Sequence, residues 1–438
     1  MNDVAVIVLA AGESTRFWPF EEKNTIQVFG KPLFLHQLEF LSRNGFSHII
    51  VVANPKNETL IRRSLPSFCD LTIQKKPGNQ AYAILAAAPY VKGKSVLIVN
   101  ANDFVEDSLL TDVRKHIKDK STEASLVGYK VNSYFPGGYL VTEGKYVRDV
   151  IEKPGVGNEP SNLVRIVFDY FRESDVLFST LRKIKSPKGD IYEQAVSQLL
   201  RSKILKATLV KYRKKWSPLK YPWHMLPVSE HFLRNLKGYR GRNTQIAKDA
   251  VLSGPVYIED GVKIFEQSKI VGPCYLGKNV IIGNHTLVRK SVVEEGSVLG
   301  FGCDVTRSYI GPKSWFHANY LGDSVIGKNV SFGSGAVTAN LRLDEKEILS
   351  MVSDEKIQTG LRKLGVICGD DVRVGVHASL MPGVKIGQGS VVGPNVVCLD
   401  DVSSDTVYFV EQKVVAKKKT QYIGKKERQS FRKKISGR

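Results

Sequence analysis

Hydrophobic residues follow two different patterns in the two halves of the chain. In the first half, continuous aliphatic runs typical of strands buried on both faces of a parallel sheet occur at 4–9, 48–54 and 95–103. Stretches between these runs, at 33–45 and 80–91, have the pattern of helices. Strands that alternate with helices predict a doubly wound α/β sheet over residues 1–225, in which ligands bind beyond the carboxyl ends of the strands.

From residue 246 onward the hydrophobic period changes to six. Aliphatic or aromatic residues recur at this spacing from Ile246 to Val288, with minor slips from Val293 to Phe332, and again from Val374 to Val392. A six-residue period places one inward side chain on each side of a triangular coil, with Gly and Asn at the corners. The pattern predicts a parallel β-helix over residues 246–410, joined to the first domain by a connecting helix and linker at 226–245.

Residues 341–365 lack the six-residue period and interrupt the predicted coil. Insertions in solenoid proteins are commonly surface loops. Such loops also build binding sites on one face of the solenoid. Both interpretations stay open for this segment.

The net charge of +21 is high and favours a substrate or partner rich in phosphate. Residues 413–438 hold eleven Lys or Arg and one acid, Glu427, and so contribute ten of these 21 charges. A terminal run of this kind at 411–438 is typical of a solvated, partly disordered tail. Contact of the tail with nucleic acid or an anionic membrane is the alternative.

The five cysteines are scattered and show no paired metal-ligand spacing, as expected for reduced core residues: Cys69, Cys274, Cys303, Cys368 and Cys398. The first apolar run passes directly into a glycine turn, which predicts a strand and not a signal peptide. No window approaches the roughly twenty apolar residues of a membrane helix. We therefore expect a cytoplasmic protein.

The segment LAAGESTRFWPFEEKNTIQVFGKPLF (9–34) contains a glycine turn followed by Arg16 and Lys23. Backbone N–H groups at such a turn can hold phosphate, and two cations neutralise a triphosphate. The segment closely resembles the signature of sugar-1-phosphate nucleotidyltransferases, with the lysine spacing of the N-acetylglucosamine-1-phosphate uridyltransferase branch. The resemblance implies that Arg16 and Lys23 act on the phosphates as catalytic residues and that the nucleoside triphosphate contacts Leu9, Ala10, Ala11 and Gly12.

Other segments of the first domain carry the same resemblance. Gln74 and Gly78, the latter in the segment 77–81, match the family's base-recognition residues. Asp103 matches its metal-binding aspartate and implies Mg²⁺ as cofactor. Gly138 and Glu152 match residues that line the sugar pocket.

Two departures from the family pattern bear on activity. Ser14 replaces the usual third glycine of the loop, and serine has less freedom at positive φ. The segment 214–233 resembles the family's closing motif, tryptophan-x-aspartate-(hydrophobic)-glycine-x-proline-tryptophan. Pro218 occupies the aspartate position and Lys220 the glycine position. In the family that aspartate shares the Mg²⁺ with the one matched by Asp103, so the metal site is altered and nucleotidyl transfer is in doubt.

The segment 314–346 carries a second resemblance, through HANYLGDS and GAVTANLR, to bifunctional uridyltransferase/acetyltransferase proteins and particularly their archaeal relatives. The resemblance implies acetyl-CoA as co-substrate and His317 as the base that deprotonates the amine of glucosamine-1-phosphate. Sugar-binding positions are matched by Tyr320, Asn340 and Lys346. The left-handed hexapeptide β-helices of such families assemble as trimers, so a homotrimer is expected.

Three hypotheses follow. The first is an enzyme that acetylates glucosamine-1-phosphate and transfers a nucleotidyl group, UMP for the matched branch, to the product. The second is a regulatory or sugar-nucleotide-binding protein with an impaired first domain. The third is a pyrophosphorylase for another hexose-1-phosphate, in which the β-helix is purely structural.

Overall fold

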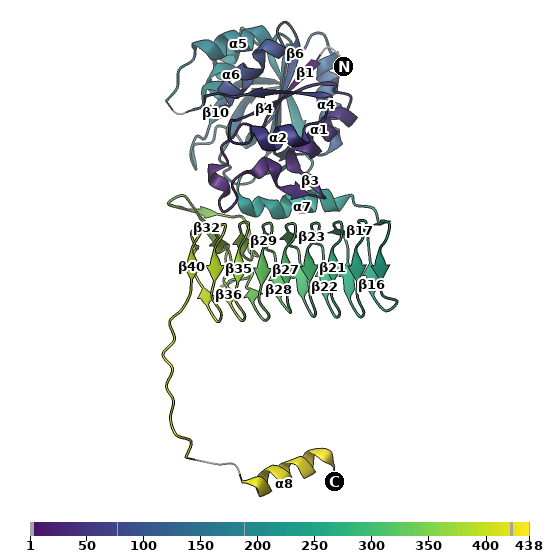
Figure 1. Ribbon diagram of the computed structural model, residues 1–438. Helices are drawn as coiled ribbons and strands as arrows, with labels where there is room; N and C mark the ends of the chain where they lie inside the picture. The colour runs from purple at the N-terminus through teal and green to yellow at the C-terminus, as the bar shows by residue number, and fades with distance from the viewer. Residues whose placement is uncertain (1–3, 77, 188, 421–423, 438) are drawn as a thin grey trace.

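The computed structural model describes residues 4–76, 78–187, 189–420 and 424–437. An α/β domain lies against one side of a long β-helix, and helix α7 (Met225–Arg234) runs between the two (Figure 1). The chain then leaves the β-helix as an extended tail that ends in helix α8 (Lys425–Ser436).

The N-terminal domain is built on one sheet of nine strands in the order β5-β4-β1-β6-β11-β8-β12-β10-β9. In chain order, these are β1 (Val4–Leu9), β4 (His48–Ala53), β5 (Cys69–Ile73), β6 (Ser95–Asn100), β8 (Ala124–Lys130), β9 (Gly138–Glu143), β10 (Tyr146–Glu152), β11 (Leu163–Phe171) and β12 (Ala207–Tyr212). The parallel strands β4, β1 and β6 confirm the three predicted strands. The sheet is mixed, because β11 follows the β9–β10 hairpin directly and runs antiparallel to β6 and β8.

Side chains of β1 alternate between two hydrophobic cores, one on each face of the sheet. Val6 and Val8 pack on the side of α1 (Leu33–Arg43), α2 (Glu58–Ser64) and α4 (Asp107–Lys118). Ala5 and Ile7 pack on the side of α3 (Gln80–Ala87), α5 (Ser174–Lys183) and α6 (Ile191–Arg201). Because helices cover both faces, a ligand can reach the sheet only at its edge or at its strand ends.

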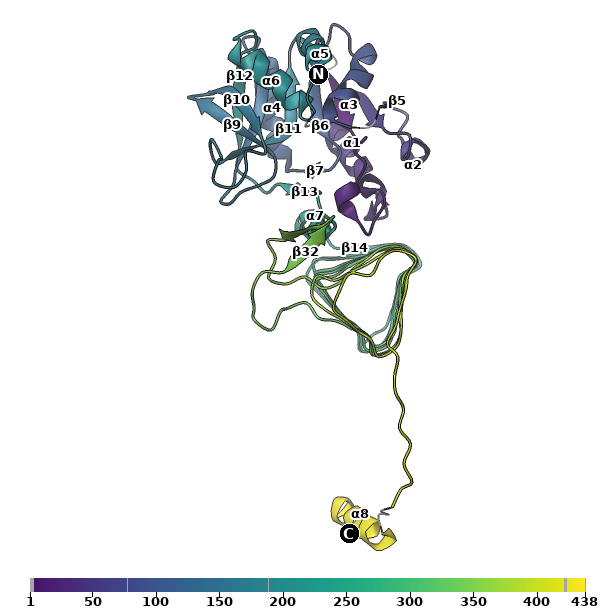
Figure 2. The same ribbon diagram turned by 90° about the vertical axis from the view of Figure 1, so that its left-hand side faces the viewer.

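In the C-terminal half, short strands stack into three parallel sheets that form the sides of triangular coils (Figure 2). The first sheet contains β14 (Tyr239–Arg240), β17 (Val256–Ile258), β20 (Cys274–Leu276), β23 (Val292–Val293), β26 (Tyr309–Ile310), β29 (Val325–Ile326), β34 (Ile367–Cys368) and β37 (Lys385–Ile386). The second contains β15 (Gln245–Ile246), β18 (Lys263–Ile264), β21 (Ile281–Ile282), β24 (Val298–Leu299), β27 (Trp315–Phe316), β30 (Ser331–Phe332), β35 (Arg373–Val374), β38 (Val391–Val392) and β40 (Val407–Tyr408). The third contains β16 (Val251–Ser253), β19 (Lys269–Val271), β22 (Leu287–Arg289), β25 (Asp304–Thr306), β28 (Tyr320–Gly322), β31 (Val337–Thr338), β36 (Ser379–Leu380) and β39 (Val397–Cys398).

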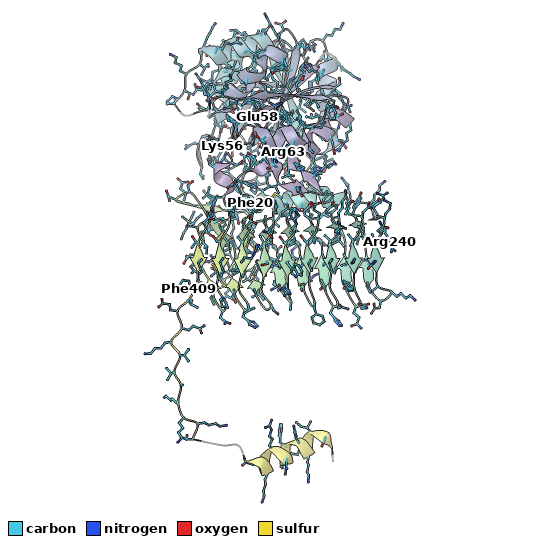
Figure 3. The ribbon with its side chains drawn as sticks, in the orientation of Figure 1. Phe20, Lys56, Glu58, Arg63, Arg240 and Phe409 are labelled. Atoms are coloured by element: carbon cyan, nitrogen blue, oxygen red, sulfur yellow. The ribbon has the colours of Figure 1, made fainter. Side chains whose placement is uncertain are left out.

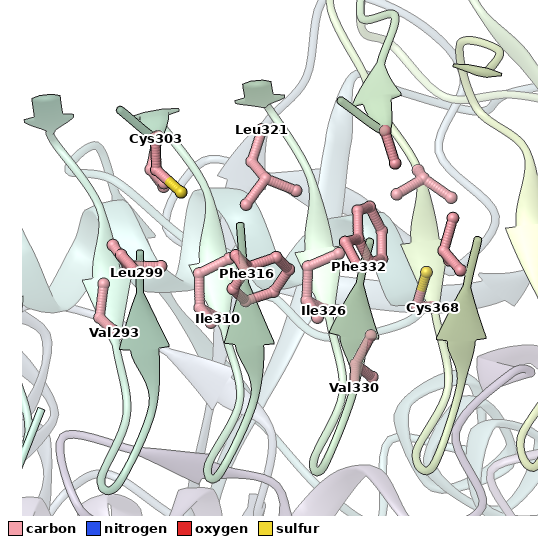
Figure 4. Packing of buried hydrophobic residues seen from close by; sticks show 14 of the residues in the cluster. Val293, Leu299, Cys303, Ile310, Phe316, Leu321, Ile326, Val330, Phe332 and Cys368 are labelled. Carbon is pink, nitrogen blue, oxygen red and sulfur yellow. The ribbon is translucent and has the colours of Figure 1, made fainter. Parts of the chain in front are cut away.

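The six-residue period fills the inside of these coils. Leu299, Phe316 and Phe332, from successive coils of the second sheet, are fully buried and lie in line (Figure 4). The predicted β-helix is thus confirmed. The first coil differs, since Leu252 remains 41% exposed. A terminal coil has a neighbour on one side only, so its anchors are less covered.

An aromatic junction joins the two domains. Phe20 lies where the N-terminal domain meets the β-helix (Figure 3) and shares a buried cluster with Trp223 and Tyr275. Across the junction, the Glu294 carboxylate accepts hydrogen bonds from the backbone N–H groups of Phe29 and Gly30 at 2.7 and 3.0 Å. These contacts tie the later part of the segment 9–34 to the β-helix.

The insertion at 341–365 forms a β-hairpin of β32 (Leu349–Val352) and β33 (Glu355–Gln358). It is anchored rather than free, because Ile348 and Leu364 are buried in the junction cluster. The basic tail differs: the side chains described in 411–437 are exposed. Among the described residues, no helix is both long and apolar enough to cross a membrane.

Candidate active sites

A cleft of about 470 Å³ opens at the carboxyl end of β1 and β6. Ten of the eleven residues predicted for the N-terminal site line it: Leu9, Ala11, Gly12, Arg16, Lys23, Gln74, Gly78, Asp103, Gly138 and Glu152. The eleventh, Ala10, lies behind the loop, where its N–H donates to the carbonyl of Val52 at 2.9 Å. Residues more than 140 positions apart in the sequence thus meet at the carboxyl ends of the strands, as expected for an α/β sheet.

Three asparagines hold the loop after β1 from behind. Asn24 and Asn57 donate to the carbonyl of Ala10 at 3.1 and 2.9 Å, and Asn54 donates to that of Ala11 at 3.1 Å. Carbonyl groups fixed on the inner side leave the outer side of the loop to the cleft. The sequence contained no motif that pointed to these supporting residues.

Ser14, the serine that replaces the usual third glycine, lies at positive φ. This residue has φ 56°, in the left-handed region where glycine is unstrained and serine is not. Its hydroxyl accepts a hydrogen bond from the Lys23 N–H at 3.3 Å and so ties the loop to the lysine. Withdrawal from solvent and the nearby Arg16 lower the pKa of Lys23 to about 8, against the opposing charges of Glu22 and Asp103.

The predicted base-recognition residues Gln74 and Gly78 both line the cleft. Gln74 is buried, and its side-chain amide donates to the carbonyl of Lys76 at 2.7 Å. Gly78 has φ 134°, a conformation that a side chain would strain. Pro77, which belongs to the predicted segment, lies outside the described residues.

Asp103, the predicted metal ligand, is already engaged by neutral donors. The Trp216 indole N–H donates to its Oδ1 at 3.0 Å, and the Asn100 amide donates to its Oδ2 at 2.8 Å. Pro218 faces Asp103 across a short antiparallel strand pair and offers no ligand. No group of three or more His, Cys, Asp or Glu side chains suited to a metal occurs among the described residues. One carboxylate with both oxygens engaged, opposite a proline, does not fit the two-aspartate cation site that the resemblance implies.

Lys220 occupies this part of the cleft instead. Its Nζ donates to the carbonyl of Pro136 at 2.9 Å and lies 3.9 Å from the centroid of the Phe135 ring. Withdrawal from solvent is the largest influence and lowers the pKa of Lys220 to about 7, while the Asp103 carboxylate acts in the opposite direction. The sequence showed that Lys220 departs from the family's closing motif, but it did not predict that this lysine lies in the cleft.

The lining of the cleft also contains charged groups that the sequence did not single out. Arg165 is buried and forms a bidentate pair with Asp169, at 3.2 and 2.5 Å, and Tyr192 donates to the same carboxylate at 2.8 Å. The remaining guanidinium nitrogen, Nη1, has no hydrogen-bond partner among the described residues. Burial raises the pKa of Glu193, which also lines the cleft, to about 7. Arg165 and Glu193 thus add charged groups to the lining of the cleft.

The second candidate site lies on the outside of the β-helix. Asn340 donates to the Tyr320 hydroxyl at 3.3 Å and to the Asp323 carboxylate at 2.5 Å. Arg307 pairs with that carboxylate through two contacts of 2.6 Å. Asp323 thus joins the predicted Asn340 to Arg307, and the sequence missed it although it lies within the quoted HANYLGDS. A Cβ at Gly322 would come within 2.6 Å of both Tyr320 and Asn340, so this close packing requires glycine.

His317 and Lys346 are exposed and stand apart from this cluster. The backbone N–H of His317 donates to Asn319 Oδ1 at 2.6 Å, which fixes the corner between β27 and β28. Lys346 precedes the insertion hairpin and donates its backbone N–H to Asp344 at 3.3 Å. The structure therefore brings Tyr320 and Asn340 together. No hydrogen bond among the described residues links the side chains of His317 or Lys346 to them.

Both halves of the chain match known protein families. The nucleotidyl transferase family matches residues 5–218, and the bacterial transferase hexapeptide family of six repeats matches residues 255–290 and 365–400. The fold is thus a nucleotidyltransferase domain followed by a left-handed hexapeptide-repeat β-helix.

Curated relatives match over nearly the full length. A bifunctional sugar-1-phosphate nucleotidylyltransferase/acetyltransferase of Sulfurisphaera tokodaii is 32% identical over 90% of this chain and 97% of its own. The bifunctional protein GlmU of Methanococcus vannielii is 27% identical, and that of Methanocaldococcus jannaschii 28%, each over 94% of this chain and 99% of its own. The chain belongs to the family of bifunctional sugar-1-phosphate nucleotidylyltransferase/acetyltransferases.

Proposed function

We propose that the protein catalyses two steps of sugar-nucleotide synthesis. The C-terminal site transfers an acetyl group from acetyl-CoA to glucosamine-1-phosphate. The N-terminal site then transfers UMP from a nucleoside triphosphate to N-acetylglucosamine-1-phosphate. The observation that carries the proposal is the convergence of ten predicted residues on one cleft, in a chain that also holds the Tyr320–Asn340–Asp323 cluster.

In the first step the amine of the sugar attacks the thioester carbonyl of acetyl-CoA. A C–N bond forms, the C–S bond breaks, and the amine loses a proton as CoA leaves. His317 is assigned as the base because a neutral imidazole can accept a proton and the side chain is open to a substrate. Tyr320, Asn340 and Lys346 are assigned to the sugar phosphate, with the Asp323–Arg307 pair holding Asn340 in position.

In the second step an oxygen of the sugar phosphate attacks the α-phosphorus, and pyrophosphate leaves. Arg16 and Lys23 are assigned to the charge that develops on the phosphates. The contacts to the nucleotide are assigned to Leu9, Ala11, Gly12, Gln74 and Gly78, and those to the sugar to Gly138 and Glu152. The family implies metal chemistry in general. A Mg²⁺ ion at Asp103 stays a prediction, and no step here is routed through it.

The remaining predictions belong to the same proposal. A homotrimer is supported by the hexapeptide repeats and by exposed apolar side chains on the β-helix, such as Phe301 at 64% and Trp315 at 53%. We propose a cytoplasmic location, and the five cysteines are free and buried. The division into 1–225, 226–245, 246–410 and 411–438 is kept as a working division, although strand β14 already joins the coil within the connecting segment. Contact of the tail with nucleic acid or membrane is not included.

The competing functions make different predictions. A binding or regulatory protein would release neither CoA nor pyrophosphate, and the alteration at Pro218 is its support. A pyrophosphorylase with a purely structural β-helix would release pyrophosphate only. A purely structural coil has no need of the cluster that Asp323 forms with Arg307 and Asn340. We therefore rank the pyrophosphorylase hypothesis below the bifunctional enzyme.

The acetyl-transfer assignment is tested by following CoA release with acetyl-CoA and glucosamine-1-phosphate. Replacement of His317 by alanine should abolish release. His285→Ala is the matched control, because His285 is an exposed residue at another coil corner. Unchanged CoA release in His317→Ala would contradict the assignment.

A further inference from the structure

The strand pair that carries the family's second metal ligand is intact, but its ligand is missing. In β7 (Asp103–Phe104) and β13 (Ser217–Pro218), Asp103 lies directly opposite Pro218. Just beyond the pair, the Leu219 N–H donates to the carbonyl of Asn102 at 3.0 Å, and the Asn102 amide donates to that of Leu219 at 3.0 Å. The backbone frame is therefore preserved, and the change concerns side chains only.

The substitutions alter the local charge by a defined amount. Proline in place of aspartate removes one negative charge, and lysine in place of glycine adds one positive charge at Lys220. With Lys220 protonated, the sum, +2, equals the charge of a divalent cation. Asp103 is 6% exposed and its two oxygens accept from Trp216 and Asn100, so the remaining carboxylate is held by neutral donors.

The Lys220 ammonium is fixed in the cleft rather than free in solvent. One of its three N–H donors is used by the Pro136 carbonyl at 2.9 Å, and the Phe135 ring lies beneath it. Arg16 and Lys23 line the same cleft, together with Asp103. Arg16 and Asp103 act electrostatically on both Lys23 and Lys220, so three cations share this carboxylate, although Glu152 also acts on Lys220. This local excess of positive charge favours a polyanion over a divalent cation.

We propose that the cleft binds the phosphates of its nucleotide through the ammonium of Lys220, with Arg16 and Lys23, in place of a protein-held divalent cation. Nucleotide binding is then independent of Mg²⁺. This inference rests on the proposed function, because it requires a nucleotide in the cleft. Lys220 also becomes a phosphate-binding residue in a position where the family has no side chain.

The test is calorimetric titration of the full-length protein with UTP, in excess EDTA and in excess MgCl₂. The wild-type dissociation constant should agree between the two conditions within about threefold, because charge-assisted contacts to the protein replace those to the ion. Lys220→Met keeps the packing on Phe135 and removes the charge. It should weaken binding in EDTA on the order of tenfold or more.

A reciprocal variant sharpens the test. Pro218→Asp combined with Lys220→Gly restores the family's residues at both positions and should make UTP binding at least about tenfold tighter in Mg²⁺ than in EDTA. Lys56→Met is the matched control, since Lys56 is an exposed lysine of the same domain (Figure 3) and is not among the residues that line the cleft. Thermal unfolding of each variant checks that the domain is folded.

The outcomes separate the two levels of the proposal. Wild-type binding that requires Mg²⁺ overturns the inference and leaves the proposed function standing. Binding by folded Lys220→Met that equals wild type in EDTA also overturns the inference. Absence of UTP binding in both conditions overturns the proposed nucleotidyl transfer and the inference with it.

Discussion

The two candidate sites differ in how completely one chain builds them. The N-terminal cleft gathers its cations and carboxylates inside the domain, where Asp103 is 6% exposed and Lys220 is anchored on Pro136. The β-helix site lies on an open surface, with His317 exposed beside Trp315 at 53% exposure. A preorganised cleft can act in a single chain, whereas an open coil needs a covering surface to exclude water. The difference agrees with the proposed trimer.

The interior of each site is also stabilised differently. The cleft depends on side chains that hold backbone groups, such as Asn54 and Asn57 behind the loop. The β-helix site depends on a chain of charged and polar contacts from Arg307 through Asp323 to Asn340. A substitution in one site should therefore lower the activity of that site and leave the activity of the other site unchanged.

The largest effect is expected at Lys23. Lys23→Met removes a cation from the cleft and should lower pyrophosphate release by about a thousandfold, the range seen when one preorganised charge-stabilising group is lost. CoA release should stay at the wild-type rate. Lys56→Met serves again as the exposed control. Equal loss of both activities would mean that the two sites are not independent.

The junction should respond to pH through Glu294. Burial, with Glu295 and Glu259 nearby, raises the pKa of Glu294 to about 7 from its ordinary 4.5, although the N–H groups of Gly30 and Phe29 oppose the shift. A raised carboxyl pKa means that the folded state holds a proton that the unfolded chain releases. This contribution to the free energy of unfolding is complete below 4.5 and is lost as pH rises to about 7. Its size is about 3 kcal/mol.

Glu294→Gln should remove that part of the pH dependence. Denaturant unfolding at about pH 5 and about pH 8 measures it as the difference between wild type and variant. Glu295→Gln, at the neighbouring and more exposed position, should retain the wild-type slope. A slope unchanged in Glu294→Gln would show that other groups titrate.

A smaller effect is expected at Asp323. Asp323→Ala breaks the contacts to Arg307 and Asn340 and should reduce acetyl transfer about tenfold, since it frees groups that position the sugar without removing the base. Asp323→Asn keeps an acceptor for Asn340 and should recover part of the rate. The Michaelis constant for glucosamine-1-phosphate should rise more than the turnover number falls. A turnover number that falls more than the Michaelis constant rises would assign Asp323 to the chemical step.

The smallest effect is expected from the basic tail. Removal of 411–438 should change both activities by less than about twofold, because the side chains described there are exposed. A larger loss of either activity would mean that the tail reaches a site.

The sequence predicted the features that depend on local pattern. The six-residue period fixes which side chains point inward, so burial of Phe316 and Ile326 followed from spacing alone. The first three predicted strands followed from continuous aliphatic runs. The antiparallel direction of β11 could not be predicted from such runs. It depends on pairing with β6 and β8, which lie far from β11 in the sequence.

The sites show the same limit. Motifs located ten cleft residues, but not the Trp216 hydrogen bond to Asp103, which joins residues 113 positions apart. Nor could they reveal that Glu294 accepts from the loop at Gly30 or that the insertion anchors Ile348 in the junction. Such contacts arise from domain packing and leave no periodic signal in the sequence.

The central claim, that the N-terminal half is catalytic as well as the β-helix, is tested most directly by pyrophosphate release. The full-length protein is assayed with N-acetylglucosamine-1-phosphate and a panel of nucleoside triphosphates and other sugar phosphates, with and without MgCl₂. We predict release with UTP well above that of the Asp103→Ala variant, at a rate unaffected by His317→Ala. Release that exceeds the Asp103→Ala variant for no pair in the panel would contradict the claim and favour a binding domain.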